Sequence, residues 1–286
     1  IKGTKGEVTV IHTLGKIPPA RVVVAGLGKQ KNFSADVVRQ VMGTTCRRLR
    51  GAGIKKAATI LHGAGIGGLD TAESAQAIAE GGLLGLYTFK RHFSKAEDNE
   101  KGLKELTVVE VDDSKLSTIQ EALDRGKVFA EAAMLARDMV NEPSNFMTPT
   151  HISEIALQIA EEYGLEATIM DKPQMEELGM GGLLGVAKGS TEPPKFIVLR
   201  YHGDPGNPDN NLGVLGKGIT FDTGGISLKG AAGMGEMKGD MAGAASAIGA
   251  IKAISGLRVK LNVTAVVPTT ENMPGGEAQR PGDIVR

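Results

Sequence analysis

Two lysines and two aspartates share one glycine-rich stretch, residues 216–240, which reads GKGITFDTGGISLKGAAGMGEMKGD and contains Lys217, Asp222, Lys229 and Asp240. A strand is predicted to end at Lys217-Gly218, and ligand sites in parallel α/β sheets lie outside the carboxyl ends of strands. Asp240 opens a predicted helix, where an isolated aspartate could equally be a cap. Its convergence with Asp222 on one strand end favours a shared role. A carboxylate-and-lysine site suits hard or borderline divalent ions such as Mg, Mn or Zn.

The sequence motifs of several other catalytic classes are absent from this chain. A phosphate-binding loop needs glycine at position 211 and serine or threonine at position 218, but the chain has Asn211 and Gly218. The five histidines lie outside the 216–240 stretch and lack the spacing of a zinc protease, and the Gly-x-Ser-x-Gly elbow of hydrolases is absent. Cys46 is the single cysteine, which excludes an internal disulfide and a cysteine-based zinc site, and it is interpreted as a small residue of a helix.

A second glycine cluster, GAGIGG at 63–68, lies between a predicted strand and a predicted helix and resembles a nucleotide-binding turn. No acidic residue ends the following strand where a ribose would require one, so a structural turn is the preferred interpretation. The alternative is that the N-terminal domain binds a small ligand or nucleic acid through this turn. Lys plus Arg number 33, as do Asp plus Glu, and this balance disfavours nucleic acid and membrane surfaces.

The composition indicates two domains with aliphatic cores. The 286 residues exceed the usual size of one domain, and 41% of them are hydrophobic although only 3% are aromatic. Forty glycines indicate many tight turns and close backbone approaches. Without a signal-peptide pattern or an apolar run of membrane-spanning length, a cytoplasmic location is expected. The sequence starts with Ile1 rather than Met and stops at Arg286 shortly after a Pro-Gly-Asp turn, so we expect it to be cut at both ends.

The elements that must position the candidate residues alternate along the chain. Strands are predicted at 6–13, 21–26, 56–61, 106–111, 167–170, 195–201, within 211–219 and at 260–267, and helices at 32–49, 70–85, 117–140, 150–163, 172–178 and 239–255. In the first part of the chain this rhythm predicts one α/β sheet with helices on its faces, and a second alternation of strands and helices follows. The longest helical pattern, at 117–140, stops at the turn-rich segment 141–145, so it is interpreted as a connector between two domains.

Several stretches are similar to the leucine aminopeptidase (cytosol aminopeptidase) family. They are VAGLGK at 24–29, GLYTFKRH at 85–92, NEPSNFMTP at 141–149, GMGGLLGVAKGS at 179–190 and residues 193–201. The similarity is strongest at 216–229, 237–245 and 271–283, where GKGITFDTGG is long and highly specific. The resemblance implies a smaller N-terminal α/β domain (1–116), a connecting helix (117–141) and an incomplete C-terminal α/β catalytic domain with a mixed sheet (142–286).

By this resemblance the protein is a two-metal aminopeptidase that releases leucine and other, mainly apolar, N-terminal residues from peptides. Lys217, Asp222 and Asp240 would ligate two divalent ions (Mn or Zn, alternatively Mg), with Asp222 as the bridge. Lys229 would be the catalytic lysine, and Met237 would line the pocket for the first side chain. Lys217 would have to lose its proton to ligate a metal, which burial and neighbouring cations favour. Family members usually form hexamers, so peptides and a homohexamer are the expected partners.

The chain departs from the family pattern near its last residues. The second metal-binding motif, Asn-Thr-Asp-Ala-Glu-Gly-Arg, would follow the turn at 281–283 and lie beyond Arg286. It would supply further carboxylate ligands and an arginine, so the 286-residue chain alone is expected to be inactive and to bind metal poorly. The alternative is a non-catalytic family member with a binding or regulatory role, and the intact lysines and aspartates of the 216–240 stretch argue against it.

Overall fold

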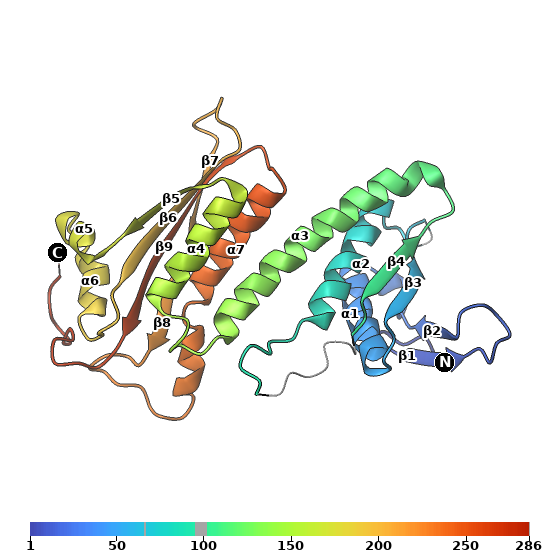
Figure 1. Ribbon diagram of the computed structural model, residues 1–286, viewed down its shortest axis with the longest axis horizontal. Coiled ribbons are helices and arrows are strands. Elements are labelled where there is room, and N and C mark those ends of the chain that lie inside the picture. Colours follow the sequence, from blue (N-terminus) through green and yellow to red (C-terminus); the bar gives the residue numbers. More distant parts are fainter. Residues whose placement is uncertain (66, 95–101, 286) are drawn as a thin grey trace. The chain divides into compact units, whose positions relative to one another are not determined.

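The computed structural model describes residues 1–65, 67–94 and 102–285. It consists of two compact units, Ile1–Glu131 and Ala132–Arg286 (Figure 1). The division falls inside α3 (Leu116–Asn141), which occupies the position predicted for the connecting helix. The first half of α3 contributes Ile119 and Ala122 to the core of the first unit, and the second half contributes Met139 to the core of the second. The domain limits at 116/117 and 141/142 stay predictions.

The first unit contains a hairpin, a parallel strand pair and two helices besides the start of α3. Its elements are β1 (Val8–His12), β2 (Arg21–Ala25), η1 (Gln30–Asn32), α1 (Ala35–Gly51), β3 (Lys56–Ile60), α2 (Thr71–Leu86), β4 (Glu105–Val109) and η2 (Asp113–Lys115). Ser34 and Asp70 cap the starts of α1 and α2, because their side-chain oxygens accept backbone N–H groups of the first turn. β1 pairs antiparallel with β2, and β3 pairs parallel with β4 across the α2 connection.

Close packing between α1 and α2 depends on glycine. A Cβ on Gly85 would lie 2.4 Å from the Cα of Gly43, and a Cβ on Gly81 would lie 2.3 Å from the carbonyl oxygen of Arg39. The Arg39 guanidinium also forms an ion pair with the nearly buried Glu80 carboxylate. The high glycine content of the sequence therefore permits close backbone approach at this helix pair, as predicted.

The prediction that the N-terminal strands form one sheet is wrong for the described residues. There they form two separate two-stranded sheets, β1–β2 and β3–β4. Among the described strands β2 pairs with β1 and β3 pairs with β4, and no ladder joins β2 to β3. Both β2 and β3 instead line a groove of about 590 Å³, with Met42, Thr45 and Leu49 of α1 also in its wall.

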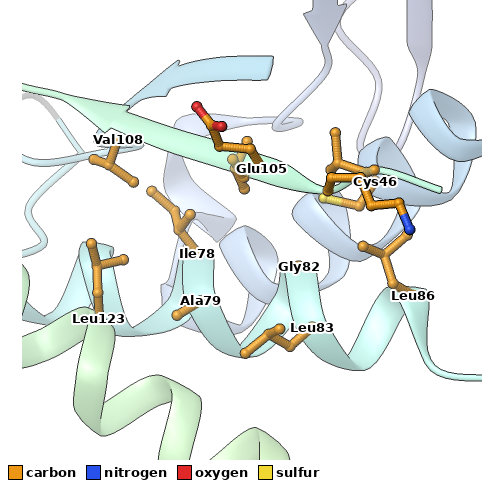
Figure 2. Close-up of a pocket in the computed structure, with 12 residues that line it drawn as sticks. Cys46, Ile78, Ala79, Gly82, Leu83, Leu86, Glu105, Val108 and Leu123 are labelled. Carbon is orange, nitrogen blue, oxygen red and sulfur yellow. The ribbon is translucent and has the colours of Figure 1, made fainter. Parts of the chain in front are cut away.

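Cys46 belongs to the core of the first unit. It lies in α1, is fully buried, and borders an apolar cavity of about 230 Å³ between α2 and β4 (Figure 2). Burial raises the pKa of its thiol to about 11, although the neighbouring Arg47 guanidinium lowers it in part. The interpretation of Cys46 as a small residue of a helix is therefore confirmed, and its thiol stays protonated in the folded protein at neutral pH.

This buried thiol predicts a loss of stability at alkaline pH. In the unfolded chain the thiol ionises near its ordinary pKa of 9.0, whereas in the folded chain it holds its proton to about 11. Between these values the unfolded state binds fewer protons than the folded state, so the free energy of unfolding falls as the pH rises. Urea denaturation across this window should show a shallower fall for Cys46→Ala than for the unchanged protein. Equal slopes for the two proteins would contradict the prediction.

The second unit is built on a mixed sheet, as predicted. Its elements after α3 are α4 (Pro149–Tyr163), β5 (Glu166–Met170), α5 (Lys172–Glu177), α6 (Gly181–Ala187), β6 (Lys195–His202), β7 (Asn211–Leu215), β8 (Gly218–Asp222), η3 (Met234–Gly239), α7 (Ala242–Gly256) and β9 (Asn262–Asn272). The strand order is β5-β6-β9-β7, and β8 also pairs with β9. β6 runs antiparallel to β5 and to β9, whereas β7 and β8 run parallel to β9.

Helices α4 and α7 lie side by side against one face of this sheet, with α6 packed separately on β9 (Figure 1). The core beneath α4 and α7 is aliphatic, as expected for a sequence poor in aromatics, and includes Ile152, Ile159, Ile197, Leu199, Ile248, Ile251, Val263 and Val267. Burial of these side chains is the main favourable term that holds the sheet and the two helices together. None of the described helices is both long and apolar enough to cross a lipid bilayer.

Candidate metal centre

The strand predicted within residues 211–219 is in fact two strands. β7 ends at Leu215 and β8 begins at Gly218, so Gly216 and Lys217 lie between them. β7 pairs with the first half of β9, and β8 pairs with the last residues of β9. The predicted strand end at Lys217-Gly218 is therefore wrong, because β7 already ends at Leu215 and β8 continues along β9 in the same register from Gly218.

The backbone of Lys217, at the break between β7 and β8, packs directly on the first turn of α7. The Lys217 carbonyl accepts the N–H of Ala244 at 2.9 Å, which gives a partner to one of the N–H groups that a helix start leaves unpaired. A Cβ on Gly216 would lie 2.5 Å from the carbonyl oxygen of Gly243, and a Cβ on Gly243 would lie 2.9 Å from the Lys217 nitrogen. Two glycines therefore permit the contact that sets the position of the Lys217 backbone.

Lys217 reaches Asp240 with its side chain. Its Nζ donates a hydrogen bond to Asp240 Oδ2 at 2.5 Å. The prediction that Asp240 opens the helix is wrong, because Asp240 is the C-terminal cap residue of η3 and α7 begins at Ala242. The Lys217 side chain is 61% exposed and that of Asp240 24%. The expected burial of Lys217 is therefore wrong for the described residues, in which the two side chains form a largely exposed ion pair.

Asp222 ends β8 next to a β-bulge. The register with β9 changes from Ile219 opposite Thr270 to Asp222 opposite Asn272, so β8 uses one residue more than its partner. Bulges of this kind bend a strand and redirect a side chain, and they occur frequently beside active sites. Here the bulge lies within β8, between Lys217 at the break before this strand and the carboxylate of Asp222 at its end.

The Asp222 carboxylate is held on both oxygens. Its Oδ1 accepts the Gly224 N–H at 2.9 Å and the Asn272 side-chain amide at 2.7 Å, and its Oδ2 accepts Lys229 Nζ at 2.6 Å. Partial burial raises the pKa of this carboxyl, but the hydrogen bonds from Lys229, Gly224 and Asn272 outweigh burial and bring the pKa below its ordinary value. Asp222 is therefore ionised at neutral pH and attracts cations.

The loop after β8 brings Lys229 back to Asp222. The Lys229 N–H donates to the Thr223 carbonyl at 2.9 Å and closes the loop. Gly224 and Gly225 adopt φ values of +89° and +67°, and a Cβ on Gly224 would lie 2.4 Å from the Ser227 carbonyl oxygen. Glycine is required for this turn, because other residues rarely adopt such angles and would clash.

η3 links the two lysine–aspartate pairs. Lys229 Nζ lies 3.1 Å from the Met237 sulfur, and the Asp240 N–H donates to the Met237 carbonyl at 3.2 Å. Throughout the part of the chain that the structure describes, no hydrogen bond or ion pair joins the Asp222–Lys229 pair directly to the Lys217–Asp240 pair. The residues singled out in the sequence thus lie on β8, on the loop that follows it and on η3, as two adjoining ion pairs.

The donor set fits divalent cations only in part. Asp222 and Asp240 each hold the cationic end of a lysine at one carboxylate oxygen, so both positions attract positive charge. Carboxylate oxygens suit hard or borderline divalent ions, and a neutral lysine amine could add a nitrogen ligand. However, the described residues contain no group of three or more His, Cys, Asp or Glu side chains that could hold a metal. The two aspartates and Lys217 therefore supply a partial ligand set.

Asn272 is a site residue that sequence reasoning missed. It is the last residue of β9, and its side chain contacts Asp222 while its main-chain carbonyl accepts the N–H and hydroxyl of Thr223 at 2.9 and 2.8 Å. It also borders a cavity of about 300 Å³ that Gly225 and Ser227 line. The signal available in the sequence was its place in the 271–283 segment, but no residue pattern assigned it a role.

The glycine cluster at 63–68 has a packing explanation. A Cβ on Gly63 would lie 2.1 Å from the Phe33 ring, and one on Gly67 would lie 2.6 Å from it. The Gly67 N–H donates to the Gly63 carbonyl at 2.9 Å, which closes the turn. Ile66 lies outside the described residues. The glycines at 63 and 67 therefore serve packing against Phe33, which favours the structural interpretation over a nucleotide site.

Two family models match most of the chain. Residues 134–286 match the catalytic domain of the cytosol aminopeptidase family, and residues 1–96 match the N-terminal domain of the same family. A probable cytosol aminopeptidase of Alkaliphilus metalliredigens is 43% identical over 285 residues, and one of Geobacter sulfurreducens is 42% identical over 288. These matches cover 99% and 100% of this chain but only 57% of each relative.

Solved structures share the fold over the same length. The bottromycin maturation enzyme BotP in complex with Mn is 34% identical with a TM-score of 0.87, and a mutant tomato leucine aminopeptidase is 29% identical with a TM-score of 0.83. Each match covers 99% of this chain, and it covers 58% of the BotP chain and 53% of the tomato chain. The fold of each unit therefore agrees with leucine aminopeptidase-type folds, as predicted.

Proposed function

Because this chain belongs to the cytosol aminopeptidase family, we propose that the whole protein is a metal-dependent aminopeptidase that releases leucine and other, mainly apolar, N-terminal residues from peptides. The observation that carries the proposal is the pair of lysine–aspartate contacts on β8 and η3 in a chain of this family. The chain spans 57% of the length of the relatives it matches, so this activity is assigned to the whole protein.

Two divalent ions would be held in part by Lys217, Asp222 and Asp240, with Asp222 between them. Mn is favoured by the complex of BotP with Mn, and Zn and Mg suit the same oxygen donors. When bound, such ions polarise a carbonyl oxygen and lower the pKa of water, which makes a nucleophile available near neutral pH. The donors of Asp222 Oδ1 are neutral or backbone groups, so its ionised carboxylate stays oriented for a cation at Oδ2.

Lys229 would act on the substrate and Met237 would shape its pocket. The Lys229 side chain is 38% exposed and its ammonium lies between Asp222 Oδ2 and the Met237 sulfur, so its charge is available at the edge of the centre. A fixed positive charge at this point stabilises the negative charge that develops on the carbonyl oxygen during attack. Met237 is apolar and adaptable, which suits contact with an apolar first side chain.

We further propose that the remaining metal ligands lie outside residues 1–286. The described residues supply two carboxylates to the centre and no cluster of three, so a complete set needs donors from elsewhere in the protein. On this basis the 286-residue chain alone is inactive and binds metal poorly. The whole protein would act on peptides in the cytoplasm as a homohexamer, as the resemblance to the cytosol aminopeptidase family implies.

Hydrolysis of aminoacyl amides tests the proposal. The whole protein, supplied with Mn or Zn, should release ammonia from leucine amide but not from N-acetyl-leucine amide, and a chelator should abolish the reaction. The chain 1–286, assayed in parallel, should be inactive. If the folded, metal-loaded protein hydrolysed neither leucine amide nor other aminoacyl amides, the non-catalytic alternative would replace this proposal. Peptidase activity of the 286-residue chain would instead refute the incomplete ligand set.

A further inference from the structure

Asn272 is not among the predicted site residues, yet its main chain and its side chain both contact the end of β8. It ends β9 directly opposite Asp222 in the register of the two parallel strands. Its main-chain carbonyl accepts both the N–H and the hydroxyl of Thr223, at 2.9 and 2.8 Å. Its side-chain amide donates to Asp222 Oδ1 at 2.7 Å. One residue of β9 thus holds two consecutive residues at the end of β8.

The side-chain contact divides the two oxygens of Asp222 between different kinds of partner. Oδ1 accepts the Asn272 amide and the Gly224 N–H, neither of which carries a charge, whereas Oδ2 accepts the Lys229 ammonium. Two donors at Oδ1 fix the rotation of the carboxylate about its bond to Cβ. Oδ2 therefore faces the Lys229 ammonium and is the oxygen directed toward cations.

The loop glycine next to Asp222 completes the arrangement. A Cβ on Gly225 would lie 2.8 Å from Asn272 Oδ1, which is closer than real Cβ atoms approach. Gly225 also has a φ of +67°, where a side chain is strained. The absence of a side chain at Gly225 therefore leaves room for the Asn272 amide beside the loop.

We propose that Asn272 is a positioning residue that orients the Asp222 carboxylate for metal binding, an inference that rests on the proposed function. An amide suits this role because it donates a hydrogen bond without carrying a charge that would repel a cation. Partners that orient a metal ligand in this way typically contribute about 10–100-fold to metal affinity or activity. Asn272 does not touch the substrate in this scheme and acts through Asp222 alone.

The test compares Asn272→Leu with Asn272→Gln in the whole protein. Leucine keeps the approximate size but removes the donor, and glutamine keeps a donor on a longer side chain. The main-chain contacts of residue 272 with Thr223 remain in both variants, so strand pairing is preserved. Asn211→Leu, at the exposed start of β7, serves as the matched control.

Equilibrium dialysis against Mn should show about 10–100-fold weaker binding for Asn272→Leu, with partial recovery in Asn272→Gln and no change in Asn211→Leu. Thermal unfolding in chelator should be similar for the four proteins, which separates positioning from a general loss of stability. Asn272→Leu binding Mn as tightly as the unchanged protein would overturn the inference, and so would equal weakening in Asn272→Leu and Asn272→Gln. Failure of the unchanged protein to bind Mn or to cleave leucine amide would instead overturn the proposed function.

Discussion

Replacement of Lys217 by arginine in the whole protein is expected to abolish metal binding at the Asp240 position and to remove aminopeptidase activity with it. A lysine can give a metal a neutral amine, whereas an arginine stays protonated in proteins and offers no lone pair. The guanidinium would also remain beside Asp240, where Lys217 Nζ now lies 2.5 Å from Oδ2, and it could bind that carboxylate through two N–H groups. A permanent cation would then occupy the place that the metal requires.

The loss of metal affinity should exceed the roughly 10–100-fold loss that is typical when a residue that only orients a metal ligand is replaced. Dialysis against Mn or Zn followed by elemental analysis measures it directly, and leucine amide hydrolysis measures the consequence. Lys260→Arg is the matched control, because Lys260 is exposed and lies just before the start of β9, whereas Asn272 is at the other end of that strand. An unchanged metal content in Lys217→Arg would show that Lys217 is only the exposed ion-pair partner of Asp240.

The sequence predicted the larger elements because their signals are local. Periodic apolar residues and a turn-rich end predicted a helix at 117–140, and the structure has α3 at Leu116–Asn141. The valine-rich runs predicted β2 and most of β9, where β-branched side chains pack well on a pleated surface. The alternation of strands and helices predicted the α/β class, which the structure and its solved relatives confirm.

The break between β7 and β8 could not be predicted from local signals. The run at 211–222 has the composition of one continuous strand, and at the break Gly216 and Gly243 let α7 pack on the backbone of Lys217. That contact joins residues far apart in the sequence. For the same reason Asp240 was assigned to the start of the helix, although the 3-10 turn η3 comes first and α7 begins at Ala242.

The role of Asn272 illustrates the same limit at the candidate site. An asparagine that follows Glu271 at the end of a strand has no distinctive spacing, and its contact with Asp222 arises from strand register. The one-residue bulge in β8 places Asp222 opposite Asn272. Residue types therefore identified the charged groups of the site, whereas the neutral group that holds Asp222 emerged only from the pairing of β8 with β9.

Lys229→Ala in the whole protein should lower kcat by about 10²–10³-fold, the range found when one donor to a developing oxyanion is removed. The Lys229 ammonium contacts Asp222 Oδ2 at 2.6 Å and the side chain is 38% exposed, so Lys229 lies at the surface of the centre, where a substrate carbonyl would approach. Its removal takes a cation away from Asp222, so metal affinity should not fall. KM should change little, because the charge acts mainly on the transition state.

Steady-state kinetics on leucine amide, with metal content measured on the same samples, separate these effects. Lys229→Arg keeps a positive charge and should recover part of the kcat that Lys229→Ala loses, whereas Lys260→Ala, the control at an exposed lysine before β9, should match the unchanged protein. If metal content fell in step with kcat in Lys229→Ala, Lys229 would act by holding Asp222. A loss of kcat at full metal content and unchanged KM, partly recovered in Lys229→Arg, assigns the Lys229 charge to an interaction made only in the transition state.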